Sequence, residues 1–179
     1  MSKHHLAQLN LGLFRAPLDS DAMAEFRLAL DPINALAEAT PGFVWRLKDD
    51  DGGSSSFVEV PGVDDPLWAP NMSVWESLDA LKHFMYKSGH ASYLRRRAEW
   101  FQRPDGLINV LWWIPAGEVP TLDDAVRRLR HLEAHGPSHE GFGLTAPLPS
   151  PSDEDAGGDA DAAGGSDAVG APSVPSGQG

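Results

Sequence analysis

Residues 107–114 have the sequence LINVLWWI, in which the last five side chains are all apolar. Alternate side chains of a strand point to opposite faces of a sheet. A strand of this composition is therefore covered on both faces, and the Trp112–Trp113 pair places one ring on each. Helices of the same chain can cover one face. We expect a second subunit to cover the other.

The pattern around this segment predicts a four-stranded sheet. Residues 4–14 alternate between apolar and polar side chains, as in a half-buried strand. Apolar stripes at helical spacing follow three candidate N-caps, which are Asp19 or Ser20, then Ser77, then Thr121. The predicted strands are 4–14, 43–47, 72–76 and 107–114, and the predicted helices are about 20–39, 77–88, 90–101 and 121–135. We expect a kink or a fresh helix start at Pro32, and a left-handed helix end at Gly89.

The order strand, helix, strand, strand, helix, strand, followed by an extra helix, is that of the split βαβ arrangement. The sequence therefore predicts an α+β fold of the ferredoxin-like kind, a four-stranded antiparallel sheet with helices on one face. The other face would be open in a monomer and lined by Trp75, by Trp45 or Arg46, and by Trp112 or Trp113. Such a surface predicts self-association, with two sheets packed face to face in a dimeric α+β barrel.

The composition changes near Pro147. Residues 147–179 are rich in Pro, Gly, Ser, Ala and Asp and contain no basic or aromatic side chain, which predicts a disordered acidic tail after a folded domain of residues 1–146. The net charge of −12 argues against nucleic acid and anionic membranes as partners. The chain has no cysteine, no apolar run of membrane-spanning length and no leader-like start, so we expect a cytoplasmic protein.

The helix predicted over residues 90–101 carries the main candidates for catalysis. His90, Tyr93 and Arg97 lie three to four residues apart and share one face. His90 could transfer a proton, and Arg97 could hold an anionic group of a substrate. In the structural alternative, His90 bonds to the backbone and Arg97 pairs with an acid such as Glu76.

Polar side chains on the predicted sheet are candidates for ligand binding. Gln8 and Asn10 lie on the polar side of the first strand, and Arg46 can point into the same space. The alternative is hydrogen bonding across a dimer interface. His131 and His135 have a spacing that can bind zinc, but the helix breaks before a third ligand, so we predict no metal site.

Four segments resemble a bacterial family of unknown function within the dimeric α+β barrel superfamily, which includes the antibiotic-biosynthesis monooxygenases. They are residues 5–14 (HLAQLNLGLF), 30–47 (LDPINALAEATPGFVWRL), 71–101 (NMSVWESLDALKHFMYKSGHASYLRRRAEWF) and 110–129 (VLWWIPAGEVPTLDDAVRRL). The resemblance implies a ferredoxin-like fold, a homodimer, and a small-molecule pocket between sheet and helices. Some members of the superfamily are cofactor-independent oxygenases, and some bind haem.

Three hypotheses follow. The leading one is a dimer that binds a small organic molecule. This dimer could also be a cofactor-independent, monooxygenase-like enzyme of secondary metabolism. The second adds haem, with His90 or His83 as axial ligand, and the third is a structural or regulatory dimer without catalysis. The predicted catalytic residues are His90 and Arg97, and the predicted ligand-binding residues are Gln8, Asn10, Arg46, Trp75, Tyr93 and Trp112.

Overall fold

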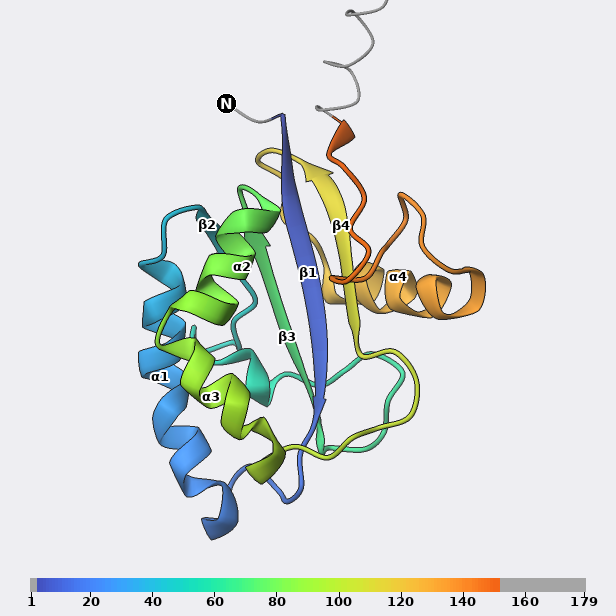
Figure 1. Cartoon of the computed structure of the whole chain (residues 1–179). Coiled ribbons are helices and arrows are strands. Elements are labelled where there is room, and N and C mark those ends of the chain that lie inside the picture. The colour runs from blue at the N-terminus through green and yellow to red at the C-terminus, as the bar shows by residue number, and fades with distance from the viewer. Residues whose placement is uncertain (1–2, 152–179) are drawn as a thin grey trace, which may run out of the picture.

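The computed structural model describes residues 3–151, which form one four-stranded antiparallel sheet with four α-helices (Figure 1). The strands are β1 (His4–Leu13), β2 (Phe43–Arg46), β3 (Trp68–Trp75) and β4 (Asn109–Pro115). The helices are α1 (Ala24–Glu38), α2 (Leu78–Lys87), α3 (His90–Arg96) and α4 (Leu122–His135). The sheet order is β2-β3-β1-β4. This is the split βαβ arrangement, and it confirms the predicted ferredoxin-like fold.

The register of the two central strands assigns each side chain to a face of the sheet. Ala7 pairs with Val74 and Trp112, whereas Leu6 pairs with Trp75 and Trp113. We call the face that carries Ala7 the α4 face, and the face that carries Leu6 the cleft face. The indole rings of the strands are therefore divided between the two faces: Trp45, Trp68 and Trp112 on the α4 face, Trp75 and Trp113 on the cleft face.

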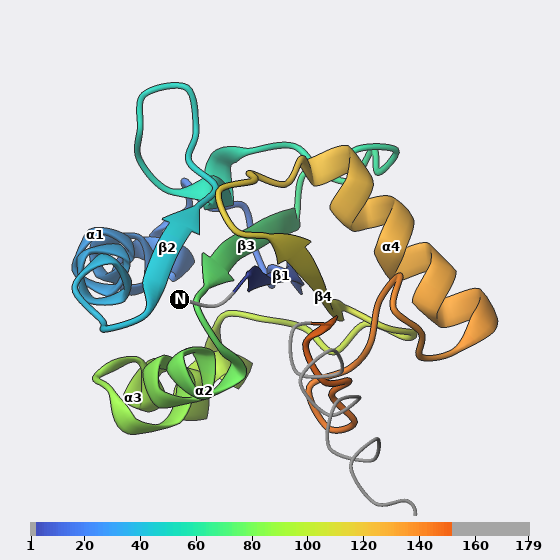
Figure 2. The ribbon, with the colours of Figure 1, turned by 90° about the horizontal axis from the view of Figure 1, so that it is seen from above.

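Helix α4 covers the face that was predicted to be open. Ala125, Val126, Leu129 and Leu132 of α4 share one buried cluster with the β-strand side chains of this face, and Val60 of the β2–β3 connection joins them. Trp112 is completely buried there. Figure 2 shows α4 on the side of the sheet opposite α2 and α3. The expected bare aromatic face is therefore wrong, because the extra helix folds back onto it.

Two parts of the chain cover the cleft face. Helices α1, α2 and α3 lie over the β2–β3 side, and the segment 141–148, which we call the strap, lies over β4 (Figures 1 and 2). Phe142 of the strap exchanges two backbone hydrogen bonds of 2.9 Å with Leu111. Both faces of β4 are thus covered by the chain itself, so a second subunit is not needed for this purpose.

The strap also moves the predicted start of the tail. Leu148 packs against the cleft-face core, its carbonyl oxygen accepts a hydrogen bond of 3.0 Å from the Trp113 indole, and Ser150 is buried. Leu148 and Ser150 therefore pack against the domain, beyond its predicted end at residue 146. The rest of the predicted tail lies outside the described residues.

Three local features differ from the predictions. Helix α1 runs through Pro32 without a fresh start, since the carbonyl that loses its hydrogen bond belongs to Leu28, which is 80% exposed on the solvent side; the predicted kink stays a prediction. Gly89 has a right-handed backbone (φ −57°) directly before α3. Strand β3 begins at Trp68 despite Pro70, because β2 pairs only as far as Ser73 and leaves Pro70 on an unpaired edge.

The predicted N-caps of two helices are confirmed. Ser77 and Thr121 accept hydrogen bonds from the backbone N–H groups of Ala80 and Asp124, three residues on. Among residues 3–151, no helix is both long and apolar enough to span a bilayer.

Candidate functional site

A row of three asparagines crosses the middle of the sheet on the cleft face. Asn10 of β1 pairs with Asn71 of β3 on one side and with Asn109 of β4 on the other. The chain contains only four asparagines, so three of the four meet in this row. Asn10 and Asn71 are exposed, although β1 and β3 are the two central strands. The cleft face is thus uncovered at this level.

A chain of hydrogen bonds leads from this row into the core. The Gln8 side-chain amide donates to Asn71 Oδ1 at 3.3 Å and to Ser73 Oγ at 2.9 Å. Ser73 Oγ also accepts a bond of 2.9 Å from the Trp75 indole N–H. Gln8 and Ser73 are buried, so these bonds satisfy polar groups that would otherwise be costly inside the protein. These hydrogen bonds hold in place the β3 side of the asparagine row, which faces α2.

Phe101 lies beside the row, further along β1. A Cβ on Gly12 would lie 2.4 Å from Phe101 Cε1, so the ring rests directly on the backbone of β1. Gly12 is two residues beyond Asn10 on the same face, about 6.7 Å along the strand. The ring also packs on Phe14 and Phe26, with centroid distances of 5.2 and 5.3 Å. An aromatic wall therefore stands next to the asparagine row.

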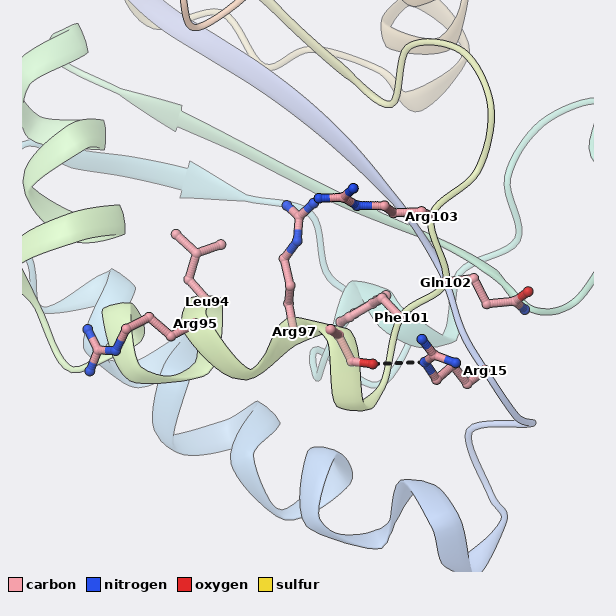
Figure 3. A pocket seen from close by; sticks show the side chains of 8 residues that line it. Arg15, Leu94, Arg95, Arg97, Phe101, Gln102 and Arg103 are labelled. Carbon is pink, nitrogen blue, oxygen red and sulfur yellow. Dashed lines mark hydrogen bonds between the residues drawn. The ribbon is translucent and has the colours of Figure 1, made fainter.

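A cleft of about 360 Å³ opens beside Phe101. It lies between the α3 end and the loop before β4, and its lining is Arg15, Leu94, Arg95, Arg97, Ala98, Phe101, Gln102 and Arg103. Four of these eight residues are arginines and none is acidic. Figure 3 shows the guanidinium groups of Arg97 and Arg103 pointing toward one another, while the Arg95 side chain points away. The cleft thus concentrates positive charge in a protein whose net charge is −12.

The two facing arginines have no partner within the described part of the chain. No ion pair or side-chain hydrogen bond involves Arg97 or Arg103 there, and the predicted alternative partner Glu76 does not reach Arg97. Arg15 is different, because its Nε donates to the Ala98 carbonyl oxygen at 2.8 Å. Arg97 and Arg103 are therefore free to bind an added group.

Arg96 has a structural role and fixes the wall that carries Arg97. Its guanidinium pairs with Glu25 of α1 at 2.6 Å and with Glu99 at 2.7 Å, and it lies 4.8 Å from the Trp100 ring centroid. Hydrogen bonding to Arg96 lowers the pKa of both carboxyl groups. This network ties α3 to α1. It leaves the next residue, Arg97, on the cleft side.

His90 lies at the other end of the cleft face. Its ring stacks on Phe84 at 4.7 Å, and Phe84 stacks on Trp75 at 5.2 Å. Trp75 pairs with Leu6, whereas the Phe101 wall rests on Gly12, six residues further along β1. Burial lowers the pKa of His90, with the Met85 backbone acting in the opposite direction. Arg97 lines the cleft and His90 does not, so the structure does not bring the two predicted catalytic residues together in this cleft.

The remaining predicted residues take other positions. Trp112 lies on the α4 face, so it cannot join a site on the cleft face. Trp75 is buried in the cleft-face core, and Tyr93 packs near Trp100. Arg46 is held by Glu38 at 2.8 Å and by the Gly53 carbonyl oxygen at 2.7 Å. Of the predicted residues, Arg97 lines the cleft, whereas Asn10 lies in the asparagine row and Gln8 is buried next to it.

Haem does not fit the surroundings of the candidate ligands. His90 Nδ1 is buried without a hydrogen-bond partner, but the ring is stacked against Phe84, and neither prominent cleft is lined by His90. His83 is exposed on α2 and likewise lines neither of them. A haem plane needs an open space beside its axial histidine. Within residues 3–151, no group of three or more potential metal ligands comes together.

Comparisons with known proteins place the chain in a family. Residues 5–158 match the family described as a domain of unknown function, DUF3291. The chain belongs to the DUF3291 family. No curated protein matches it.

Solved structures similar to this DUF3291 chain include Rv0793 from Mycobacterium tuberculosis, at 18% identity and a TM-score of 0.40, covering 65% of this chain and 99% of that one. A mutant of SnoaB, a cofactor-independent oxygenase from Streptomyces nogalater, has 15% identity and a TM-score of 0.39, covering 66% and 97%. NE2512 of Nitrosomonas europaea, a protein of unknown function, has the same identity, coverage and TM-score.

Proposed function

We propose that this protein binds a small organic molecule on the cleft face, with the asparagine row as the polar floor and Phe101 as the apolar wall. The observation that carries the proposal is the exposure of Asn10 and Asn71 on the two central strands of the sheet. Binding sites for small molecules combine apolar walls with a few convergent polar groups. Amide side chains both donate and accept, so they suit carbonyl and hydroxyl groups.

The size of the opening favours a compact ligand. The cleft of about 360 Å³ is near the lower end of the range for small-molecule sites, about 300–1,000 Å³. Phe101 and Leu94 offer an apolar surface for a ring, while the asparagine row begins next to Gly12, on which Phe101 rests. A flat ring with one polar substituent directed at the sheet matches this arrangement.

Binding of 2-naphthamide, followed by isothermal titration calorimetry, tests this function. We expect saturable binding that Asn10→Ala or Asn71→Ala weakens about 2- to 10-fold, as for loss of a neutral hydrogen bond. Asn34→Ala is the matched control, because Asn34 lies on α1 and its Nδ2 has no hydrogen-bond partner. Absence of saturable binding, or equal effects of all three variants, would contradict the proposal.

The monooxygenase-like reaction and the homodimer stay hypotheses within this proposal. Of the two predicted catalytic residues, Arg97 lines the cleft and His90 does not. A second copy would have to use a surface other than the face covered by α4. Sedimentation velocity at micromolar concentration distinguishes a dimer from a lone protomer, and consumption of oxygen with an aromatic phenol as substrate tests the reaction.

A further inference from the structure

Arg97 and Arg103 form a feature that the amide floor and the aromatic wall do not explain. They come from different segments, one from the turn after α3 and the other from the loop before β4, and their guanidinium groups point toward one another (Figure 3). Like charges brought together repel unless a negative group lies between them. No carboxylate of the described chain takes that place.

The arginines that form ion pairs all lie outside the lining of the cleft. Within the described residues, a carboxylate lies within 4 Å of Arg46, Arg96, Arg127 and Arg128. The chain has 26 acidic residues against 14 basic ones, so carboxylates are abundant. The four arginines on the cleft differ from these four, because none of them has an acidic partner within residues 3–151.

We infer that the ligand of the cleft is an anion, and specifically an aromatic carboxylate whose carboxyl group sits between Arg97 and Arg103 while its ring lies on Phe101. This inference rests on the proposed function, which it deepens by naming the ligand class. The guanidinium group presents a planar fork of N–H donors that matches the two oxygens of a carboxylate. Two such groups from opposite walls hold the carboxylate in one orientation, with the ring parallel to the aromatic wall.

The exposure of both arginines predicts how the interaction responds to salt. Charges open to solvent are screened by dissolved ions over a Debye length of about 10 Å at 0.1 M. Carboxylate binding should therefore weaken as the ionic strength rises, whereas binding of a neutral ring compound of the same shape should change little. This difference separates the arginine pair from the asparagine row.

The test compares 2-naphthoate with 2-naphthamide, which share the ring system and differ in charge. At low ionic strength we expect the full-length protein to bind the carboxylate at least about 10-fold more tightly than the amide, as for charge-assisted bonds. Arg97→Gln or Arg103→Gln should remove most of this preference, and Arg97→Lys should retain part of it. Arg130→Gln is the control for net charge, because Arg130 lines the separate cleft beside Gly62.

The possible results distinguish failure of this inference from failure of the proposed function on which it rests. Amide binding without a preference for the carboxylate, or a preference that survives in both glutamine variants, would overturn the inference alone. Failure of both probes to bind would overturn the proposed function and the inference together. Circular dichroism of each variant verifies folding, which we expect to be unchanged because both arginine side chains are exposed.

Discussion

The contact between Gly12 and Phe101 supports the wall of the cleft, so Gly12→Ala is the most informative change to the fold. The new methyl group would lie 2.4 Å from Phe101 Cε1 and 2.9 Å from Cδ1. Favourable contacts between carbon atoms lie at about 3.5–4.0 Å, so the ring must move by about 1 Å or more. Phe14 and Phe26 hold the ring at centroid distances of 5.2 and 5.3 Å and resist this movement.

Overpacking of this kind costs about 1–3 kcal/mol. The loss of glycine entropy from the unfolded chain offsets about 0.4–1 kcal/mol of that cost. We therefore expect Gly12→Ala to lower the free energy of unfolding by about 1–2 kcal/mol in urea denaturation followed by tryptophan fluorescence. Gly143→Ala is the control, because its new methyl group would find only Thr145 Oγ1, at 4.0 Å.

A double-mutant cycle shows whether the ring is the cause. Phe101→Val removes the ring atoms that crowd Gly12, so Gly12→Ala should become neutral or stabilising in that background. An equal loss of stability in the wild-type and Phe101→Val backgrounds would refute the reasoning. It would show that the cost arises in the backbone of β1 rather than at the aromatic wall.

Three further changes test other parts of the molecule. Thr121→Ala removes the N-cap bond to the Asp124 N–H and should cost about 1 kcal/mol in urea denaturation, whereas Thr145→Ala, at an exposed position of the strap, should cost little. Burial lowers the pKa of His90, so this side chain binds a proton more readily in the unfolded chain than in the folded one. The free energy of unfolding of the wild type should therefore fall as the pH drops below about 6.5. The free energy of unfolding of His90→Phe should fall less between about pH 7.5 and 5.5. Hydrogen bonds to Arg96 lower the pKa values of Glu25 and Glu99. Arg96→Gln should therefore destabilise the protein at about pH 7, and this effect should shrink as the pH falls below about 4.5 and the two carboxylates take up protons; an effect that stays constant as the pH falls would argue against the network.

Sequence patterns were sufficient for the order and type of the elements. The alternation in residues 4–14 predicted β1, and Thr121, the apolar stripe and Gly136 predicted α4. An apolar stripe shows that a helix packs on something, but it does not say which face of a sheet it meets. The apolar segment 110–114 was therefore assigned a second subunit, whereas α4 and the strap cover it.

The candidate site depended on information that only the tertiary structure holds. Asn10 and Arg97 were predicted because each occupies a polar position in a periodic segment. Sequence reasoning missed three residues of the site. Asn71 follows a proline, Asn109 belongs to an apolar strand, and Arg103 lies in a loop, so none of them occupies a polar position in a periodic segment. The strand register brings the asparagines into one row, and register depends on long-range pairing that local pattern does not determine.

The central claim is that the asparagine row is a binding surface, and the side-chain amide signals of the four asparagines in a ¹⁵N–¹H spectrum test it most directly. Titration with 2-naphthamide should shift the signals of Asn10, Asn71 and Asn109 together, to one common saturation point, and leave Asn34 in place. A titration that saturates while the three row signals stay fixed would contradict the account.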